Sequence, residues 1–369
     1  MRNSLSRFRE SLESGGRLER IVECIKSNCI DLFQANEVPE IRIVSCGNMR
    51  DGVLARMRIT IDDKIQDICV KEYRPSDTAR ENVRQRLQRE YNALRVLTQM
   101  GSRVGGVRVV KPIGCLYDLN LLVTEEIPGE ALHAILKRRG RLLPGRANLS
   151  KLQRYCRLSG QWLSAFQEVS RSIETTPYDV RAALDEMRRV VDEESNDLLL
   201  TRSMANRVLD WLEKCARELP DECEVSGMHS DFVPSNLIVA DDKVVVLDFE
   251  CFRSGPVYRD AITFLHALDN YLVNPLFSRE TIRLLQEEFL SGYKARIKNE
   301  DVSLVRMLEV RETLGQINNW SEFGRNKVWG RWSRRRAQGR LTSRLTELLL
   351  ERGQGEAGHR ICGVLWRVV

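Results

Sequence analysis

The spacing of apolar residues changes partway along this 369-residue chain, and that change constrains the fold more than any other feature. Before Pro128 apolar and polar residues alternate, as they do from Met57 to Ile61, and a period of two residues is typical of β-strands. After Pro128 the apolar residues recur with the period of a helix. We therefore predict an α+β protein in which residues 1–127 form a small antiparallel sheet with one helix and a helical N-terminal extension, and residues 128–369 form a mainly helical unit.

The same patterns predict the individual elements. In the first unit we expect a strand around 41–44, a hairpin that turns at Asp62–Asp63, a helix over 81–100 that ends before Gly101, and strands over 109–115 and 120–127. In the second unit we expect helices over 151–170, 180–192, 204–219, 279–298, 304–317 and 340–352. Only 236–239 and 243–247 read as strands there, and they predict a hairpin across Asp241–Asp242.

Composition indicates an ordinary globular protein, since 42% of the residues are hydrophobic and 30% are charged. The net charge of +6 is modest for this length, so nucleic-acid binding is not expected. The ten cysteines form no Cys-x-x-Cys pair and no zinc-finger spacing, which favours reduced, mostly buried thiols. Residues 1–15 lack the apolar core of a signal peptide and no apolar run could span a bilayer, so we expect a cytoplasmic protein.

Three polar side chains, Asp231, Asn236 and Asp248, surround the hairpin predicted in the second unit. Asn236 leads into its first strand and Asp248 follows its second, so paired strands would bring the amide and the carboxylate within reach of one cation. Mg²⁺ favours a few oxygen ligands of this kind. Taken alone, Asp231 would be an ordinary turn or helix-cap acid, but beside a magnesium site it can accept the proton of a nucleophile in phosphoryl transfer.

A second candidate pair, Lys71 and Glu90, lies in the first unit. Lys71 ends an apolar strand, and Glu90 lies on the helical stripe that must face the sheet. Such a pair would aim the ammonium group at nucleotide phosphates. Glu72 and Glu81 compete with Glu90 as the partner, although the position of Glu81 near the helix start is explained by the helix dipole.

A glycine-rich phosphate loop would be expected between the first two strands, where the chain offers Gly47 and Gly52. Backbone amides in such a loop can cradle phosphates. A plain hairpin turn explains the segment equally well.

These residues resemble the aminoglycoside phosphotransferase and choline kinase family of small-molecule kinases. Its pattern of His-x-Asp-x-x-x-x-Asn, a short hairpin and Asp-Phe/Trp-Glu is matched by residues 229–236 and 248–250. Its downstream Gly-Pro and Asp-Leu-Ala are echoed by residues 255–256 and 260–261. The resemblance extends from about residue 41 to 265 and implies a two-lobed, protein-kinase-like fold that uses ATP and Mg²⁺.

The resemblance also implies a role for each candidate residue. The catalytic base would be Asp231, the magnesium ligands Asn236 and Asp248, the phosphate-positioning pair Lys71 and Glu90, and the hinge that meets adenine Glu125, Glu126 and Ile127. Asp260 would brace the catalytic loop. Glu250 would either support a ligand or contact magnesium through water.

The chain departs from the family in two places. Gln167 stands where the family often carries a histidine, which affects packing, and the phosphate loop is poor in glycine, which would weaken nucleotide binding. Neither departure removes a group that performs chemistry. The Asp-Phe-Glu sequence and the lack of an Ala-Pro-Glu segment argue against a eukaryotic-type protein kinase, so the acceptor would be a small hydroxylated molecule such as a sugar, an amino alcohol or a lipid head group.

A basic segment, residues 320–340, has a composition that could concern the acceptor. It carries Arg325, Lys327, Arg331, Arg334, Arg335, Arg336 and Arg340 together with Trp320, Phe323, Trp329 and Trp332. Such a segment can bind an anionic sugar, a lipid head group, a membrane surface or nucleic acid, whereas a solvated helix is the more ordinary explanation. If it lined the acceptor site, it would disfavour a polycationic aminoglycoside.

We therefore predict an ATP- and magnesium-dependent phosphotransferase that moves the γ-phosphate directly to a hydroxyl of a small molecule, which can be anionic. The alternative is a catalytically silent nucleotide-binding scaffold, a pseudokinase, whose basic segment recruits an anionic partner or a membrane. The intact catalytic trio argues against that alternative, while GTP in place of ATP and any oligomeric state are compatible with these residues. His133, His266 and His359 have no cysteine or carboxylate at ligand spacing, so we expect structural roles for them, and His229 is expected to hold the catalytic loop.

Overall fold

A computed structural model of the protein describes residues 16–34, 37–49, 52–61, 63–74, 82–104, 108–141, 144–171, 178–194, 200–220, 223–294, 296–322, 328–350, 358–362 and 364–367. The chain divides into two compact units. The first comprises residues 1–102, 109–128 and 247–251, and the second comprises residues 103–108, 129–246 and 252–369. Asp248 therefore belongs to the first unit, although the chain on either side of segment 247–251 belongs to the second.

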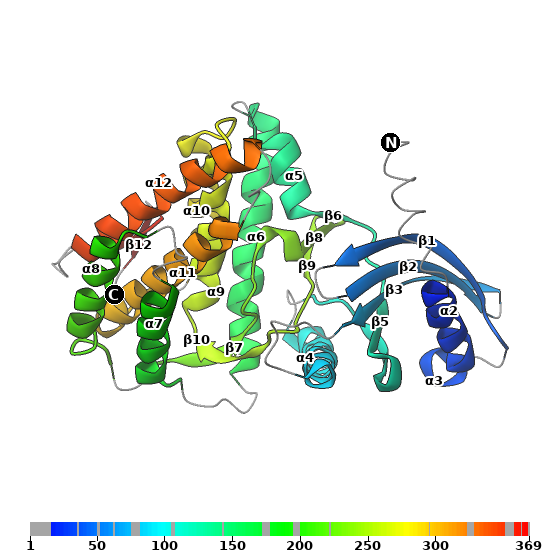
Figure 1. The fold of residues 1–369 in the computed structure, drawn as a ribbon. Coiled ribbons are helices and arrows are strands. Elements are labelled where there is room, and N and C mark those ends of the chain that lie inside the picture. Colours follow the sequence, from blue (N-terminus) through cyan, green and yellow to red (C-terminus); the bar gives the residue numbers. More distant parts are fainter. Residues whose placement is uncertain are drawn as a thin grey trace. The chain divides into compact units, whose positions relative to one another are not determined.

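The first unit is built on a five-stranded antiparallel sheet (Figure 1). Its strands are β1 (Glu40–Met49), β2 (Gly52–Ile61), β3 (Lys64–Tyr73), β4 (Pro112–Leu116) and β5 (Leu121–Glu125), in the spatial order β1-β2-β3-β5-β4. The predicted β2–β3 hairpin is confirmed, and β4 joins β5 through the short helix η1 (Tyr117–Leu119). β1 is longer than expected, because residues 45–49 pair with β2.

Three helices accompany this sheet: α2 (Arg17–Ser27), α3 (Cys29–Phe33) and α4 (Val83–Val104). Ile21 and Ile25 of α2 pack on one face of the sheet in a buried cluster that includes Met57 and Val70 (Figure 1). Successive side chains of a strand point to opposite faces, so Lys71, the neighbour of Val70, points to the other face. The prediction that the helix ends before Gly101 was wrong, because α4 continues to Val104.

The second unit is mainly helical, as predicted. Its helices are α5 (Leu132–Arg139), α6 (Arg146–Ser170), α7 (Val180–Glu194), α8 (Arg202–Cys215), α9 (Arg259–Asp269), α10 (Arg279–Tyr293), α11 (Val302–Glu322) and α12 (Val328–Leu350), with short 3-10 turns η2 (Pro234–Asn236), η3 (Asn270–Val273) and η4 (Asn299–Asp301). Its strands are β6 (Glu130–Ala131), β7 (Val225–Met228), β8 (Leu237–Ala240), β9 (Lys243–Val246), β10 (Arg253–Pro256), β11 (Gly358–Ile361) and β12 (Val364–Arg367). They form a β6-β8-β9 sheet and the pairs β7–β10 and β11–β12.

The prediction of only two strands in this unit was wrong. Strands β6, β7, β10, β11 and β12 are two to four residues long, which is too short to show an alternating pattern. Helix α9 was missed because it is buried on nearly all sides and so lacks the polar face of an amphipathic helix. Helix α12 begins at Val328 and not at Arg340, since its arginine-rich first half shows no apolar stripe.

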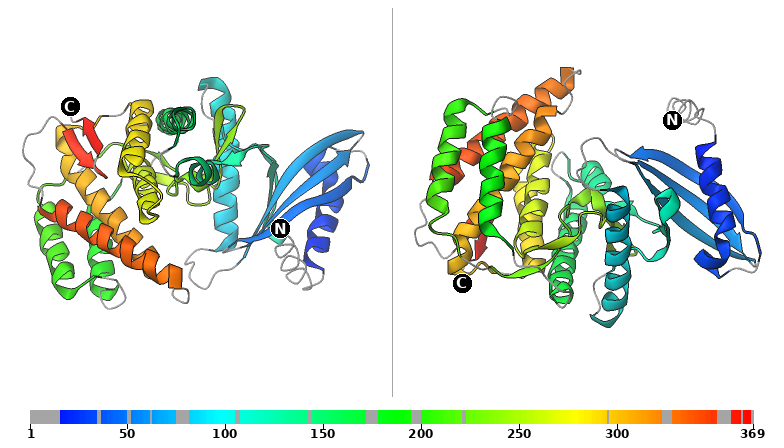
Figure 2. Two further views of the ribbon diagram at one scale, coloured as in Figure 1. Left: turned by 90° about the horizontal axis from the view of Figure 1, so that it is seen from above. Right: turned by 60° about the horizontal axis from the view of Figure 1, so that its bottom comes forward.

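Helices α6 and α10 pack closely at the centre of the second unit (Figure 2). Gly160 of α6 and Gly292 of α10 permit this approach, because a Cβ at either position would collide with a backbone carbonyl of the other helix. Trp162 of α6 stacks on Phe232, with ring centroids 5.5 Å apart. Phe232 directly follows Asp231, so the core anchors the segment that carries the predicted catalytic base.

The described residues bear on two expectations, the absence of a membrane-spanning helix and the reduced state of the cysteines. None of the helices in these segments combines the length and the apolar character needed to cross a membrane. All ten cysteines lie in described segments and are free thiols, as predicted. They are less buried than expected, since six are half-buried and Cys251 is exposed.

Candidate active site

The loop that carries Asp231 lies between β7 and β8 in the second unit. Asp231 is exposed, and its backbone carbonyl and its Oδ2 both accept hydrogen bonds from Asn236 Nδ2, at 3.0 and 2.7 Å. The Asp231 amide donates to Nδ1 of the buried His229 at 3.3 Å. The predicted base is thus held in place by the loop itself, with its carboxylate open to solvent.

Asp260 of α9 holds the start of this loop. Its two carboxylate oxygens accept the amides of His229 and Ser230, at 2.6 and 2.9 Å, and its side chain is fully buried. Burial raises the pKa of Asp260, while the nearby His229 and the two amide donors oppose that rise. Ser230 has a φ of 70°, a left-handed conformation that is uncommon for serine, so these hydrogen bonds hold a strained turn just before Asp231.

Gln167 supports the same region from α6. Its Nε2 donates to the Val257 carbonyl at 2.5 Å, and its Oε1 accepts the hydroxyl of Tyr293 at 2.7 Å. The Tyr293 hydroxyl also lies 2.8 Å from the Val257 carbonyl. The residue that departs from the family pattern therefore secures the segment leading to Asp260 and does not touch the loop chemistry.

Replacing Asp260 with asparagine should loosen the catalytic loop. One of the two acceptor oxygens becomes an NH₂ group that faces a backbone amide, so we expect a loss of about 2 kcal/mol in the free energy of unfolding. Urea unfolding would give that loss, and hydrogen exchange would show faster exchange at the amides of residues 229 and 230. Asp185→Asn is the matched control, because Asp185 is exposed on α7 and pairs across one turn with Arg188. Unchanged exchange in Asp260→Asn would show that Asp260 does not brace the loop.

The two predicted magnesium ligands, Asn236 and Asp248, flank the hairpin β8–β9 in the sequence. Leu237 pairs with Val246, Asn236 directly precedes this pair, and Asp248 follows two residues after Val246. Asp248 has a φ of 69°, so a second non-glycine residue of the motif adopts a left-handed conformation.

The first unit brings Lys71 into contact with three carboxylates. Lys71 Nζ lies 3.0 Å from Glu90 Oε2, 2.5 Å from Asp248 Oδ1 and 3.3 Å from Glu250 Oε2. Among the predicted partners, Glu90 of α4 makes the contact, whereas Glu72 pairs with Arg17 and Glu81 lies outside the described residues. The cluster is a compact site at which carboxylate oxygens converge on a positive charge.

Burial and neighbouring charge tune this cluster in opposite directions. Burial works against the charge of Lys71, but Glu90, Asp248 and Glu250 hold its pKa above the ordinary lysine value. Burial raises the pKa of Glu90, and Lys71 opposes that rise. Lys71 is therefore a permanent cation, and the carboxylates around it can share a second cation such as magnesium. The site fits that ion, since Mg²⁺ prefers a small set of oxygen ligands.

Sequence reasoning missed two arginines of α4 that support this cluster. Arg86 Nη2 lies 3.1 Å from Glu250 Oε2, and Arg89 Nη1 donates to the Glu250 carbonyl at 2.8 Å. Glu90 Oε1 accepts the amide of Phe249 at 3.2 Å. Arg86 precedes Glu90 by four residues, so the two share a helix face, and that spacing was the available signal.

The predicted hinge residues and Gly47 lie in the first unit. The amides of Glu125 and Glu126 donate to the carbonyls of Lys111 and Asp67, both at 3.0 Å, and Ile127 is buried. Gly47 pairs with Leu54 inside the β1–β2 ladder, so it lies in a strand and not in a loop. Phe323, Arg325 and Lys327 of the basic segment lie outside the described residues.

A cavity of about 430 Å³ adjoins the catalytic loop within the second unit. Residues 233–235 of the loop line it, together with Lys137, Tyr271 and Trp320. None of the described residues that line it is an aspartate or a glutamate. Arg335, Arg336, Arg340 and Arg344 of α12 line a different cavity, of about 730 Å³, so most arginines of the basic segment that the structure describes do not open beside the catalytic loop.

Comparison with known proteins places these features in a family. The model of the phosphotransferase enzyme family, APH, matches residues 49–296. No curated protein sequence matches the chain.

Several solved structures share the fold at low sequence identity. Amicoumacin kinase hAmiN in complex with AMP-PNP, Ca²⁺ and Ami is 11% identical, with a TM-score of 0.53 over 82% of this chain and 88% of that chain. Glucosamine kinase is 16% identical, with a TM-score of 0.52 over 88% and 99%. The streptomycin-ATP-APH(2")-IIa ternary complex is 15% identical, with a TM-score of 0.50 over 88% and 95%. These likenesses confirm the predicted two-part, protein-kinase-like fold.

Proposed function

This chain belongs to the phosphotransferase enzyme family, and we propose that it transfers the γ-phosphate of ATP to a hydroxyl group of a small molecule. One observation carries the proposal: the exposed carboxylate of Asp231 is fixed by Asn236, on a loop braced by buried Asp260, beside a cavity that the same loop lines. ATP is proposed as the donor because one similar structure holds ATP and another holds AMP-PNP.

Each polar group then has a defined task. Asp231 orients the acceptor hydroxyl and takes its proton late in the transfer. Asn236 and Asp248 would hold Mg²⁺, which when bound neutralises charge on the phosphates. Lys71, aimed by Glu90, would contact the phosphates once the nucleotide draws it from Asp248.

Adenine would be met by the segment of residues 125–127. The amides of Glu125 and Glu126 already donate to carbonyl groups of the sheet, so the amide of Ile127 is the proposed donor to the base. Gly47 would contribute to phosphate binding from its position in β1. A Cβ added to this glycine would have no other atom within 4 Å, so the space beside it is open. A close approach of phosphate to the strand backbone is compatible with that open space.

The acceptor cavity favours a neutral or anionic molecule with an apolar part. Tyr271, Phe277 and Trp320 supply aromatic surface, and Lys137 supplies positive charge. Carboxylates are the groups that would pair with the ammonium groups of an aminoglycoside, and the described lining contains none. The arginine-lined cavity is larger, but we assign the acceptor to the smaller one because the catalytic loop forms its wall.

The proposed function is tested by magnesium-dependent ATP turnover with a panel of acceptors. The panel would contain sugars, amino alcohols, nucleosides, lipid head groups and an aminoglycoside, each measured with the purified full chain. We expect turnover with a neutral or anionic acceptor and none with the aminoglycoside. Tight ATP binding without turnover on any acceptor would favour the nucleotide-binding scaffold.

Replacing Trp320 with alanine should weaken acceptor binding without affecting ATP. The indole lines the acceptor cavity, and loss of such an aromatic contact should raise the acceptor KM about tenfold at an unchanged KM for ATP. Initial rates on the best acceptor of the panel provide the measurement. Trp332→Ala is the matched control, because Trp332 is 39% exposed on α12 and does not line this cavity. If Trp320→Ala and Trp332→Ala change the acceptor KM equally, the cavity is not the acceptor site.

A further inference from the structure

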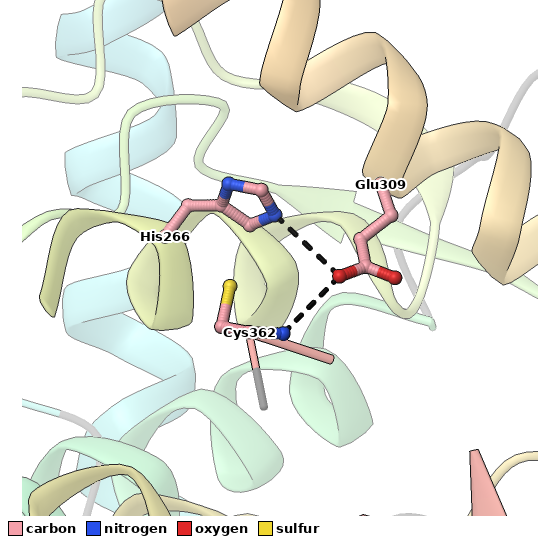
Figure 3. Close-up of side chains that lie close together, drawn as sticks. All are labelled: His266, Glu309 and Cys362. Carbon is pink, nitrogen blue, oxygen red and sulfur yellow. Dashed lines mark hydrogen bonds and ion pairs between the residues drawn. The ribbon is translucent and has the colours of Figure 1, made fainter. Parts of the chain in front are cut away.

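A buried group of three potential metal ligands lies in the second unit and shares no residue with the site described above. His266 projects from α9, Glu309 projects from α11, and Cys362 lies in the turn after β11 (Figure 3). One ligand atom of each residue lies within 4.8 Å of the other two. The exposed fraction is 2% for His266 and 0% for Glu309. No ligand spacing in the sequence connects His266 with these partners, because all three residues are far apart along the chain.

The contacts inside the group converge on one carboxylate oxygen. Glu309 Oε1 lies 3.8 Å from His266 Nε2 and accepts the Cys362 amide at 3.2 Å (Figure 3). His266 Nε2 is buried and has no hydrogen-bond partner among the described residues. A buried ring nitrogen without a partner costs free energy, so its presence points to a ligand at this position.

The three donor atoms match the preferences of a borderline-soft divalent cation. Imidazole nitrogen, thiolate sulfur and carboxylate oxygen are the donors that Zn²⁺ takes in proteins. Bonds of about 2.0 to 2.3 Å at a tetrahedral centre place two ligand atoms roughly 3.5 Å apart, and the ligand atoms of this group lie within 4.8 Å of one another. We propose that His266, Glu309 and Cys362 bind one Zn²⁺ ion, a site that does not depend on the proposed kinase function.

Arg344 is the group that most directly competes for this carboxylate. Its Nη2 lies 2.5 Å from Glu309 Oε1 and 2.8 Å from the Arg360 carbonyl. A carboxylate offers about four acceptor positions, two on each oxygen, and Arg344 and the Cys362 amide take those of Oε1, so the cation would bind the second oxygen, Oε2. Hydrogen-bond donors on a metal-bound carboxylate are common and orient the ligand. Arg344 would then orient Glu309 and tie it to β11.

A route for the ion exists beside the group. Cys362 lines the cavity of about 730 Å³, which α10 and α12 also line. This cavity can admit the cation and supply a water molecule as the fourth ligand. Binding exchanges the thiol proton of Cys362 for the cation, and the proton leaves to solvent.

The site would fasten the C-terminal hairpin β11–β12 to α9 and α11. Trp366 of β12 packs edge-on against Tyr258 and Tyr293, with ring centroids 6.1 and 5.6 Å apart. Tyr293 in turn contacts the Val257 carbonyl, three residues before Asp260. Zinc would therefore act as a structural ion. Through Trp366, Tyr293 and Val257 it would support Asp260, which holds the start of the catalytic loop.

The zinc content of the purified full chain tests the proposal. After incubation with zinc chloride and dialysis into metal-free buffer, we expect about one Zn²⁺ per chain by elemental mass spectrometry. Cys362→Ser and His266→Asn should each reduce this value at least about fivefold. Cys223→Ser is the matched control, because Cys223 is another half-buried cysteine of the same unit and should retain the ion. Zinc retention that is absent in the wild type, or equal in all variants, would overturn the site.

A second measurement guards against variants that fail to fold. Wild-type protein would be stripped with a chelator and reloaded with Zn²⁺ alone, and hydrogen exchange would be followed in residues 358–367. We expect exchange in this hairpin to accelerate on stripping and to slow again on reloading, with α2 and α3 unchanged as an internal reference. If hydrogen exchange in residues 358–367 is the same with and without zinc, the group is an ion-pair network between Glu309 and Arg344 and not a metal site.

Discussion

Replacing Asp231 with alanine should abolish phosphoryl transfer while leaving nucleotide affinity nearly unchanged. The Asp231 side chain is exposed and is held by Asn236 Nδ2 at 2.7 Å, on the loop whose residues 233–235 line the acceptor cavity, so it is placed to meet an acceptor hydroxyl. Removal of a general base costs roughly 10²- to 10⁴-fold in rate, and its role in orienting the hydroxyl adds to this loss. The rate constant kcat on the best acceptor and the Kd for magnesium-ATP are the two measurements.

The matched control for this change is Asp210→Ala, which removes an exposed aspartate of α8 in the same unit. It should leave both kcat and Kd unchanged. Full transfer by Asp231→Ala would contradict the assignment of the base. A large loss of nucleotide affinity in that variant would instead indicate that Asp231 holds the nucleotide, and the division of labour between Asp231 and Asp248 would be wrong.

Sequence reasoning reached those parts of the site whose residues lie on regular elements at short spacing. Asp231 and Asn236 are five residues apart in one loop, and two short apolar runs across the Asp241–Asp242 turn predict the β8–β9 hairpin that leads to Asp248. Glu90 was preferred over Glu72 because it lies on the apolar stripe of a helix, and the structure pairs it with Lys71. Local periodicity therefore carried the prediction of the sheet and of most helices.

Contacts that depend on packing between distant segments left no such trace. His266, Glu309 and Cys362 come from a helix buried on nearly all sides, a long helix and a short hairpin, and no spacing rule connects them. The hydrogen bond from Arg89 to the Glu250 carbonyl likewise joins a helix to a loop far along the chain. Two left-handed residues of the motif, Ser230 and Asp248, are also invisible in sequence, because neither is a glycine.

Replacing Lys71 with methionine should damage both stability and transfer. Methionine fills a similar volume but leaves Glu90, Asp248 and Glu250 together without their shared cation. Removing one partner of a buried ion pair costs about 3 kcal/mol, and solvent around the partly exposed Asp248 and Glu250 should keep the loss near the lower end. Transfer should fall by roughly 10²-fold or more, because a charge on the phosphates is no longer neutralised.

The stability of Lys71→Met should depend on pH in a direction that a simple loss of packing would not produce. Without Lys71 the buried Glu90 loses the cation that opposes the rise in its pKa, so the folded state raises this pKa further above that of the unfolded chain. A group whose folded pKa is raised contributes stability below its unfolded pKa and loses it as the pH rises through the folded pKa. The difference in free energy of unfolding between wild type and Lys71→Met should therefore narrow from about pH 8 to about pH 5.

Urea unfolding at several pH values measures this difference, with Lys64→Met as the control. Lys64 is the exposed first residue of the same strand β3, so its replacement should change stability little at any pH. A constant difference between wild type and Lys71→Met across the pH range would mean that the carboxylates do not depend on Lys71 for their charge. In that case the contacts of Lys71 at 2.5 to 3.3 Å would not stabilise the first unit. The proposal that this cluster positions a nucleotide would then lose its support.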